Sequence, residues 1–270
     1  MKELPSHKLN VRNDIVYEVN SQTPFTGYEV QHYDTGEIEF KFCYKDGQQE
    51  GESITYYLSG QWHFKANYKK GELNGLCKSY YENGQLAARE TYKDGVKDGS
   101  YEEYYENGKL KSKGTRNNDV LDGSYESYYE NGRLISKGTY KNGERISLWE
   151  SYDTEGRLEY KHTYKDGQLA ARETYKDGVK DGSYEEYYEN GQLRDTETYK
   201  NDVRDGPFAS YYENGQLKSK GTRNNDVLDG SYASYYENGQ LKEKSIYVNG
   251  FRKRLIKSYD EKGNPNKKSI

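Results

Sequence analysis

Polar and apolar residues alternate along most of this chain with a period of two, the spacing at which side chains alternate between the two faces of a β-strand. The alternation runs through stretches of strand length that are rich in Tyr and Thr, such as residues 85–92 and 99–105. Turn pairs such as Asp94-Gly95 and Asn107-Gly108 separate these stretches. Such pairs favour two-residue type I′ turns, because both central residues of that turn have positive φ. The pattern predicts successive β-hairpins and no helix longer than two turns, apart from terminal caps.

The hairpins belong to a repeat. Residues 85–108 recur letter for letter as residues 168–191, and the glycine that ends each Tyr-Tyr-Glu-Asn-Gly segment, or a variant of it, returns every 24 residues. The exception is the 35-residue interval from Gly156 to Gly191, which is longer by 11 residues, or half a module. A fixed period is typical of arrays whose units pack on their neighbours. We therefore predict an all-β fold: an elongated antiparallel β-meander of about ten 24-residue β-hairpin repeats, forming a single-sheet, solenoid-like ribbon that is twisted and coiled.

The repeat also defines the expected domains. Residues 1–24 form an N-terminal cap, residues 25–255 form the array with a half-repeat insertion near 157–178, and residues 256–270 form a C-terminal cap and tail. Half a module provides one strand and a turn, and one added strand would reverse every later strand and exchange the edges of the ribbon. We expect an irregularity between Gly156 and Asp181: a bulge, a kink or an unpaired strand.

A two-residue turn at residues 107–108 assigns each side chain to one of two faces. It pairs Tyr105 with Leu110, and Tyr101 with Gly114, whose small size leaves room for the ring. These residues form the expected packing face, on which the leucine column continues as Leu86, Leu134, Leu193, Leu217 and Leu241. Seven glycines near the strand starts are expected to form bulges or kinks: Gly51, Gly75, Gly99, Gly123, Gly182, Gly206 and Gly230.

The opposite face is predicted to be polar and to carry a second column of tyrosines. Charged residues of opposite sign lie across from one another and fix the register, as Glu102–Lys113, Glu126–Lys137 and Glu150–Lys161. This face is a candidate interface, because tyrosine provides a large amphipathic contact area at low entropic cost. The alternative is that its rings only stabilise the sheet.

Composition narrows the classes of protein. Only 31% of the residues are apolar, but 15% are aromatic and 32 are tyrosines, which favours an ordered thin sheet over a disordered chain. The net charge of −4 argues against a nucleic-acid partner. No apolar run has the length of a membrane span, and residues 1–20 lack the apolar stretch of a signal peptide. We expect a soluble, cytoplasmic protein.

Residues that could carry chemistry are scattered. His7, His32, His63 and His162 fall in different modules, with no recurring catalytic grouping around them. Cys43 and Cys77 are expected on opposite faces as free thiols, which suits a reducing compartment. The Asp-rich loop at 117–123 lacks the bidentate Glu of a calcium loop, and its residues are those that tight turns select. We predict no enzyme, no cofactor and no metal site.

The segments 104–110, 92–95 and 98–101 carry the pattern Tyr-Tyr-x-Asn-Gly-x-Leu, Tyr-Lys-x-Gly and Asp-Gly-x-Tyr. This pattern resembles the bacterial variant of the MORN (membrane occupation and recognition nexus) repeat, and especially the YwqK-family antitoxins. The resemblance covers nearly the whole array from Gly36 to Gly263. It implies a non-enzymatic scaffold that binds a protein partner, such as an antitoxin or immunity protein that neutralises a cognate toxin. The alternatives are a carbohydrate- or choline-binding surface module and a membrane-associated scaffold.

The most regular modules, at 97–134 and 180–241, are expected to hold the partner. They give unbroken polar columns, whereas the terminal modules are degraded. The predicted partner-binding residues form an anchor row with a lysine rim: Tyr104, Tyr128, Tyr187, Tyr211, Tyr235, Lys113, Lys137 and Lys220.

Overall fold

The computed structural model describes residues 1–266, and residues 267–270, the end of the predicted tail, lie outside this description. The described part is almost entirely β-strand, and its one helical element is the 3₁₀ helix η1 (Ser6–Lys8). The chain divides into two compact units, Met1–Leu134 with Tyr140–Gly143, and Ile135–Thr139 with Glu144–Ile270. The prediction of an all-β chain of consecutive hairpins is confirmed.

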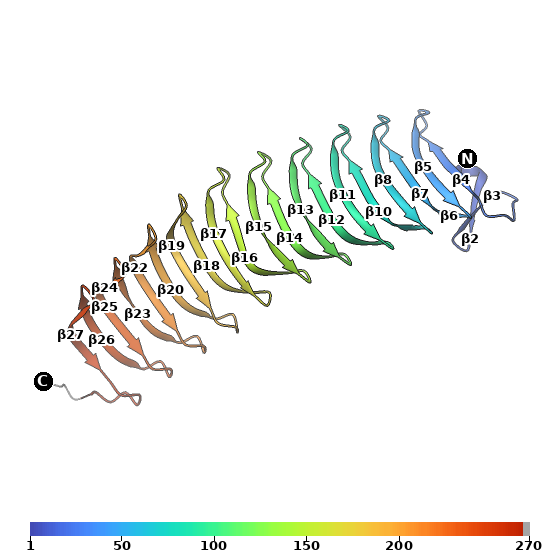
Figure 1. Cartoon of the computed structure of the whole chain (residues 1–270). Coiled ribbons are helices and arrows are strands. Elements are labelled where there is room, and N and C mark those ends of the chain that lie inside the picture. Colours follow the sequence, from blue (N-terminus) through green and yellow to red (C-terminus); the bar gives the residue numbers. More distant parts are fainter. Residues whose placement is uncertain (267–270) are drawn as a thin grey trace. The chain divides into compact units, whose positions relative to one another are not determined.

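The first unit begins with strands whose pairing differs from that of the rest of the meander. Strand β1 (Glu3–Pro5) pairs in parallel with β4 (Gly27–His32), while β2 (Leu9–Arg12) and β3 (Ile15–Glu18) form a separate hairpin. Val16, Phe25 and Tyr44 pack together beneath them. The antiparallel strands that follow (Figure 1) are β5 (Ile38–Lys45), β6 (Gln48–Gln49), β7 (Gly51–Tyr56), β8 (Trp62–Lys69), β9 (Glu72–Leu73), β10 (Gly75–Tyr80), β11 (Leu86–Lys93), β12 (Val96–Tyr104), β13 (Leu110–Asn117) and β14 (Val120–Tyr128). The sheet is therefore mixed, because of this one parallel pair.

The second unit is an antiparallel meander along its whole described length. Strand β15 (Leu134–Lys141) contributes residues to both units. The strands that follow (Figure 1) are β16 (Glu144–Tyr152), β17 (Leu158–Lys165), β18 (Gln168–Lys176), β19 (Val179–Tyr187), β20 (Leu193–Lys200), β21 (Val203–Arg204), β22 (Gly206–Tyr211), β23 (Leu217–Asn224), β24 (Val227–Leu228), β25 (Gly230–Tyr235), β26 (Leu241–Val248) and β27 (Phe251–Ser258). Each strand from β16 onward pairs with the strand next to it in the sequence.

The two kinds of turn differ in backbone geometry. At the Asp-Gly turn, Asp94 has φ 48° and Gly95 has φ 83°, as a type I′ turn requires, so this prediction is confirmed. At the other turn, Gly108 has φ 80°, but Asn107 is not among the residues with positive φ. The amide of Gly108 donates to the carbonyl of Tyr105 at 2.8 Å, which closes a three-residue loop in place of the predicted type I′ turn.

This longer loop corrects the predicted packing face. Tyr104, and not Tyr105, lies opposite Leu110, because the strand carries an extra residue, Lys111, between Leu110 and Ser112. The same shift recurs at Tyr80, Tyr152, Tyr187, Tyr211 and Tyr235. The leucine column therefore shares a face with the tyrosines that were assigned to the polar face.

Aromatic rings that pack against glycines on the neighbouring strand are among the buried residues of the sheet. Tyr101 pairs with Gly114 as predicted, and a Cβ built on Gly114 would stand 2.9 Å from the Tyr101 ring. The same arrangement occurs at Gly138, where an added Cβ would overlap the Trp149 ring, and Trp149 is 1% exposed. The glycines near the strand starts adopt positive φ, for example 123° at Gly99, and a register shift lies opposite that glycine, so the predicted bulges are confirmed.

The second tyrosine of each Tyr-Tyr pair links one module to the next. The Tyr105 hydroxyl donates to the carbonyl of Tyr128 at 2.7 Å, and the Asn107 side-chain amide donates to the carbonyl of Glu130 at 3.4 Å. The same hydroxyl-to-carbonyl bond, at 2.7–3.0 Å, is made by Tyr33, Tyr57, Tyr81, Tyr188, Tyr212 and Tyr236. This link was not predicted, although the 24-residue recurrence of the tyrosine is visible in the sequence.

We expect Tyr105→Phe to destabilise the chain by about 1 kcal/mol, because it leaves the half-buried carbonyl of Tyr128 without its donor. Urea denaturation measures the change. Tyr104→Phe is the matched control, since its hydroxyl bonds the side chain of Glu102 within the same strand. An equal or smaller loss for Tyr105→Phe would contradict the linking role.

Candidate functional site

The half-module insertion forms an ordinary strand, β18, paired on both sides. Lys161 and His162 of β17 lie opposite Glu173 and Arg172 of β18. A bulge does occur between Thr163 and Tyr164, inside the expected region, but regular modules carry register shifts of the same kind. The insertion is therefore not marked by any interruption of strand pairing.

The added strand exchanges the two edges of the sheet in the second unit, as expected for a paired strand. Lys165, beside the Asp-Gly turn at 166–167, forms an ion pair at 2.5 Å with Glu189 of the Glu-Asn-Gly loop. A cavity of about 490 Å³ lies between this turn and this loop. In regular modules turns of like kind are neighbours, as where Gly143 donates to the carbonyl of Leu121 at 2.8 Å. After β18, the Glu-Asn-Gly loops of this unit therefore lie on the edge of the sheet where the Asp-Gly turns lie before β18.

The faces are exchanged as well, although the half-module predicted only an exchange of edges. Residues paired across strands share a face. Trp149 is thereby connected through His162 and Arg172 to Glu185. Within the second unit, the column of Trp149 thus continues into the column of Glu185, because a strand that reverses its direction within a growing sheet is rotated by a half-turn about the direction of growth. That rotation moves both edges and faces.

The predicted anchor row is divided as a result. Tyr104, Tyr128 and Lys113 belong to the first unit. In the second unit, Lys137 forms an ion pair with Glu150, on the face of Tyr152, whereas Lys220 belongs to the Glu185 column. Tyr187, Tyr211 and Tyr235 lie on the same face as Lys220. Lys137 and Lys220 therefore point to opposite faces of the second unit and do not form one rim.

Within regular modules the polar columns form a connected network. The carboxylate of Glu102 accepts from the Tyr104 hydroxyl and forms an ion pair with Arg89 at 2.6 Å, and hydrogen bonding to Arg89 lowers the pKa of Glu102. Lys113 forms an ion pair with Glu126 at 3.0 Å. Each exposed pair contributes only a few tenths of a kcal/mol, but the network holds the side chains in fixed positions.

The C-terminal modules keep the tyrosines and lysines of this network but lack the glutamates. Ala209 and Ala233 occupy the position of Glu102, and they lie on either side of Lys220. A groove of about 730 Å³ runs over them, with Lys220, Lys244 and Tyr235 among its lining residues. The later modules thus present a surface with different chemistry.

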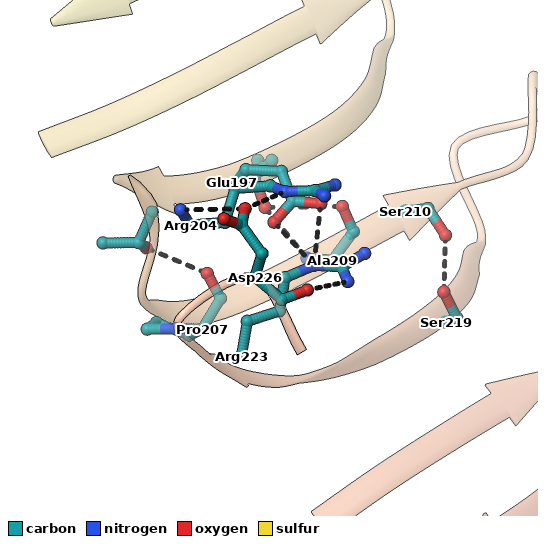
Figure 2. A network of polar contacts seen from close by, with 10 residues as sticks. Glu197, Arg204, Pro207, Ala209, Ser210, Ser219, Arg223 and Asp226 are labelled. Atoms are coloured by element: carbon teal, nitrogen blue, oxygen red, sulfur yellow. Dashed lines mark hydrogen bonds and ion pairs between the residues drawn. The ribbon is translucent and has the colours of Figure 1, made fainter. Parts of the chain in front are cut away.

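Polar contacts hold the strands below this groove (Figure 2). Arg223 approaches Glu197 at 3.2 Å, Arg204 approaches Asp226 at 2.9 Å, and the hydroxyls of Ser210 and Ser219 lie 2.6 Å apart. The Thr196 hydroxyl accepts from the amide of Ala209 at 3.1 Å. The groove therefore lies on a well-connected part of the sheet.

His162 is enclosed between Trp149 and Arg172 on the neighbouring strands. Burial lowers the pKa of His162, and the positive charges of Arg172 and Arg145 lower it further. Because protonation is disfavoured in the folded state, the folded chain retains its full stability above the unfolded-state pKa of about 6.5 and loses stability as the pH falls below it.

We therefore expect the melting temperature to fall between about pH 7.5 and pH 5.5. His162→Gln should remove this part of the pH dependence, because glutamine does not titrate. Thermal melts of both proteins across this range measure the difference. Parallel pH profiles for the two proteins would contradict the assignment.

The remaining candidates for chemistry lie apart from one another. Cys43 and Cys77 are buried free thiols, and burial raises the pKa of both. Within residues 1–266 no group of three or more His, Cys, Asp or Glu side chains could hold a metal ion. In the same range, no helix has the length and apolar character needed to cross a membrane. The Asp119 carboxylate of the Asp-rich loop accepts from the Lys97 amide of the preceding module at 2.9 Å.

Comparison with solved structures gives matches of low similarity. They include TcdB2-TccC3 with Cdc42 (14% identity, 82% of this chain and 14% of the other, TM-score 0.21) and TcdB2-TccC3 (12% identity, 88% and 17%, TM-score 0.21). A third is the Tc holotoxin pore of Photorhabdus luminescens (15% identity, 84% and 14%, TM-score 0.21). This chain thus spans about a seventh of the length of the chains it matches, and TM-scores this low carry no argument. Comparison with curated proteins gives no match.

The comparison with protein families is decisive. The MORN repeat variant matches eight segments, which cover more than half of the chain: 49–70, 73–94, 97–118, 121–142, 147–166, 180–201, 204–225 and 228–249. These segments coincide with the hairpin modules, and residues 167–179, which include all of β18, fall between two matches. The chain belongs to the MORN repeat variant family.

Proposed function

We propose that this chain is a non-enzymatic scaffold that binds a protein partner through the polar faces of its modules. The observation that carries the proposal is the network of tyrosine, glutamate and basic side chains, which holds half-buried rings in fixed positions, as where Tyr187 donates to Glu185 at 2.6 Å. Burial raises the pKa of Tyr187 to about 12, so its hydroxyl stays a donor at neutral pH. Rings held in place lose little entropy on binding, which favours them as interface anchors.

The proposed class of partner is a toxin that this chain neutralises as an antitoxin or immunity protein. Support comes from the resemblance of the modules to those of YwqK-family antitoxins and from the repeat architecture, which offers an extended binding surface. We place this activity in a reducing cytoplasm of a bacterial cell, where the buried thiols Cys43 and Cys77 would stay free.

The test is to express the product of the neighbouring gene with and without this chain, and to measure cell growth and the affinity of the two purified proteins. Growth arrest that this chain relieves, together with direct binding, is the expected result. Binding to oligosaccharides, choline or lipid vesicles but not to the protein would favour the alternative carbohydrate, choline or membrane functions.

Two sets of variants then locate the surface. Tyr104→Ala with Tyr128→Ala should weaken binding by about 1 kcal/mol or more per anchor while the chain stays folded. Tyr101→Ala is the folding control, because Tyr101 is 5% exposed and covers Gly114. If the Tyr104 and Tyr128 double variant unfolds as the Tyr101 variant does, the polar face of the first unit is structural only.

A further inference from the structure

The networks of the earlier modules show which chemical group their tyrosines and basic residues bind. Glu126 accepts from the Tyr128 hydroxyl and from Lys113 at 3.0 Å. Glu150 accepts from the Tyr152 hydroxyl at 2.9 Å and forms an ion pair with Lys137 at 2.8 Å. In each case one carboxylate lies between a tyrosine two residues later and a lysine on the neighbouring strand.

The last modules keep these donors and lack the carboxylate. Ala209 and Ala233 replace the glutamates, two residues before Tyr211 and Tyr235, and both lie across from Lys220. Within residues 1–266, the Tyr211 and Tyr235 hydroxyls and the Lys220 and Lys244 ammonium groups make no hydrogen bond or ion pair. These four donors are therefore available to a bound molecule.

The groove over the two alanines is lined by two lysines whose ammonium groups are unpaired in the described part of the chain. Ala233, which is 6% exposed, forms part of its floor, and Lys220 and Lys244 lie on either side of that alanine. Lys257 of β27 lies across from Lys244 and continues the basic row. The two carboxylates that also line the groove are already engaged, Glu185 by the Tyr187 hydroxyl and Glu197 by Arg223.

We propose that this groove binds an extended acidic segment of the protein partner, whose carboxylates take the place that Glu126 and Glu150 hold in their own modules. Lys220 and Lys244 lie two strands apart, so the carboxylates should be spaced by about 10 Å. An acidic residue at every third position of a polyproline II segment meets this spacing, since three residues rise by about 9 Å on one side of that helix. The inference rests on the proposed protein-binding function and specifies where the partner binds and with which charge.

The probe is a fluorescent peptide with four Glu-Pro-Pro units, compared with the same peptide carrying Gln-Pro-Pro units, and anisotropy with the full chain measures affinity. We expect the glutamate peptide to bind at least about tenfold more tightly than the glutamine peptide, with an affinity that falls as salt is added. Lys220→Ala with Lys244→Ala should abolish this preference. The matched control is Lys65→Ala with Lys141→Ala, whose lysines are already paired with Glu52 and Asp122 and are not among the predicted partner-binding residues.

A second variant supplies the missing carboxylates from within the chain. The double variant Ala209→Glu with Ala233→Glu should fold. Its affinity for the glutamate peptide should fall by at least about tenfold, because the new carboxylates would bind the lysines and tyrosines themselves. Undiminished binding by this variant, or no glutamate peptide binding up to about 1 mM, overturns the inference. If the neighbouring gene's product binds this variant as well as the parent chain, the inference fails while the scaffold function stands. If that protein binds neither, the proposed function fails, and the peptide experiment still decides the inference.

Discussion

Replacement of Trp149 by alanine should destabilise the second unit by about 3–5 kcal/mol, the cost of removing a buried aromatic side chain. Trp149 is 1% exposed and lies over Gly138. Its indole nitrogen donates to the carbonyl of Thr139 at 3.2 Å, and the Arg145 guanidinium lies 4.3 Å from the ring centre. Urea denaturation measures the loss. Trp149→Tyr is the control, since tyrosine fills the equivalent position in four modules, as Tyr101, Tyr125, Tyr184 and Tyr232, and it should cost less.

A double-mutant cycle tests the contact between the ring and the glycine. Gly138→Ala alone should cost about 1–3 kcal/mol, because its Cβ would lie 2.2 Å from the Trp149 ring, which must then move. In the Trp149→Ala background the same change should cost little, since the ring is gone. Additive losses would show that the ring and Gly138 are not in contact.

Deletion of residues 168–178 should restore an unbroken 24-residue period and move the later columns of the second unit to the other face. The shortened chain would join Gly167 to Val179, and β17 would pair with β19 as β11 pairs with β12. Lys161 would then lie opposite Glu185, just as the equivalent residue Arg89 lies opposite Glu102 in the regular module. We expect the variant to fold, because every remaining strand keeps a partner.

A disulfide between Lys161→Cys and Glu185→Cys reports this new pairing, in a background in which Cys43→Thr and Cys77→Ala remove the native thiols. It should form in the shortened chain and be absent from the full chain, where β18 separates the two strands. The same bond in both chains would mean that β18 is looped out of the sheet.

The regular features of the fold were predictable because they depend on local chemistry. Asp94-Gly95 specifies its turn, Tyr101 needs a small residue opposite it, and the Glu102–Lys113 register follows from either loop length. The prediction for Tyr105 was wrong because the three-residue loop shifts the pairing by one residue, and the extra residue Lys111 shifts it back. From Glu103 and Ser112 onward, the pairs are the same as those of a two-residue turn. Beyond this bulge, the alternation of polar and apolar residues therefore fits a two-residue turn and a three-residue loop equally well.

The candidate site could not be predicted from the sequence of single modules, because it depends on how several modules are arranged. The exchange of faces at β18 is a property of the whole sheet, and an 11-residue count reveals only that a strand is added. Ala209 and Ala233 were visible as departures from the repeat at the positions of Glu126 and Glu150. Their meaning required the contacts of those glutamates with tyrosine and lysine, which only the structure provides.

Strand β18 places the columns before and after it on opposite faces of the second unit. Cross-linking of paired cysteines in the full chain, with the native thiols replaced as above and a thiol reagent that spans about 10 Å, tests this placement directly. His162→Cys with Glu185→Cys should be joined, since both residues lie on one face, two strands apart. Lys161→Cys with Glu185→Cys should stay unlinked, because the sheet separates them, and efficient linking of this second pair with failure of the first would contradict the account.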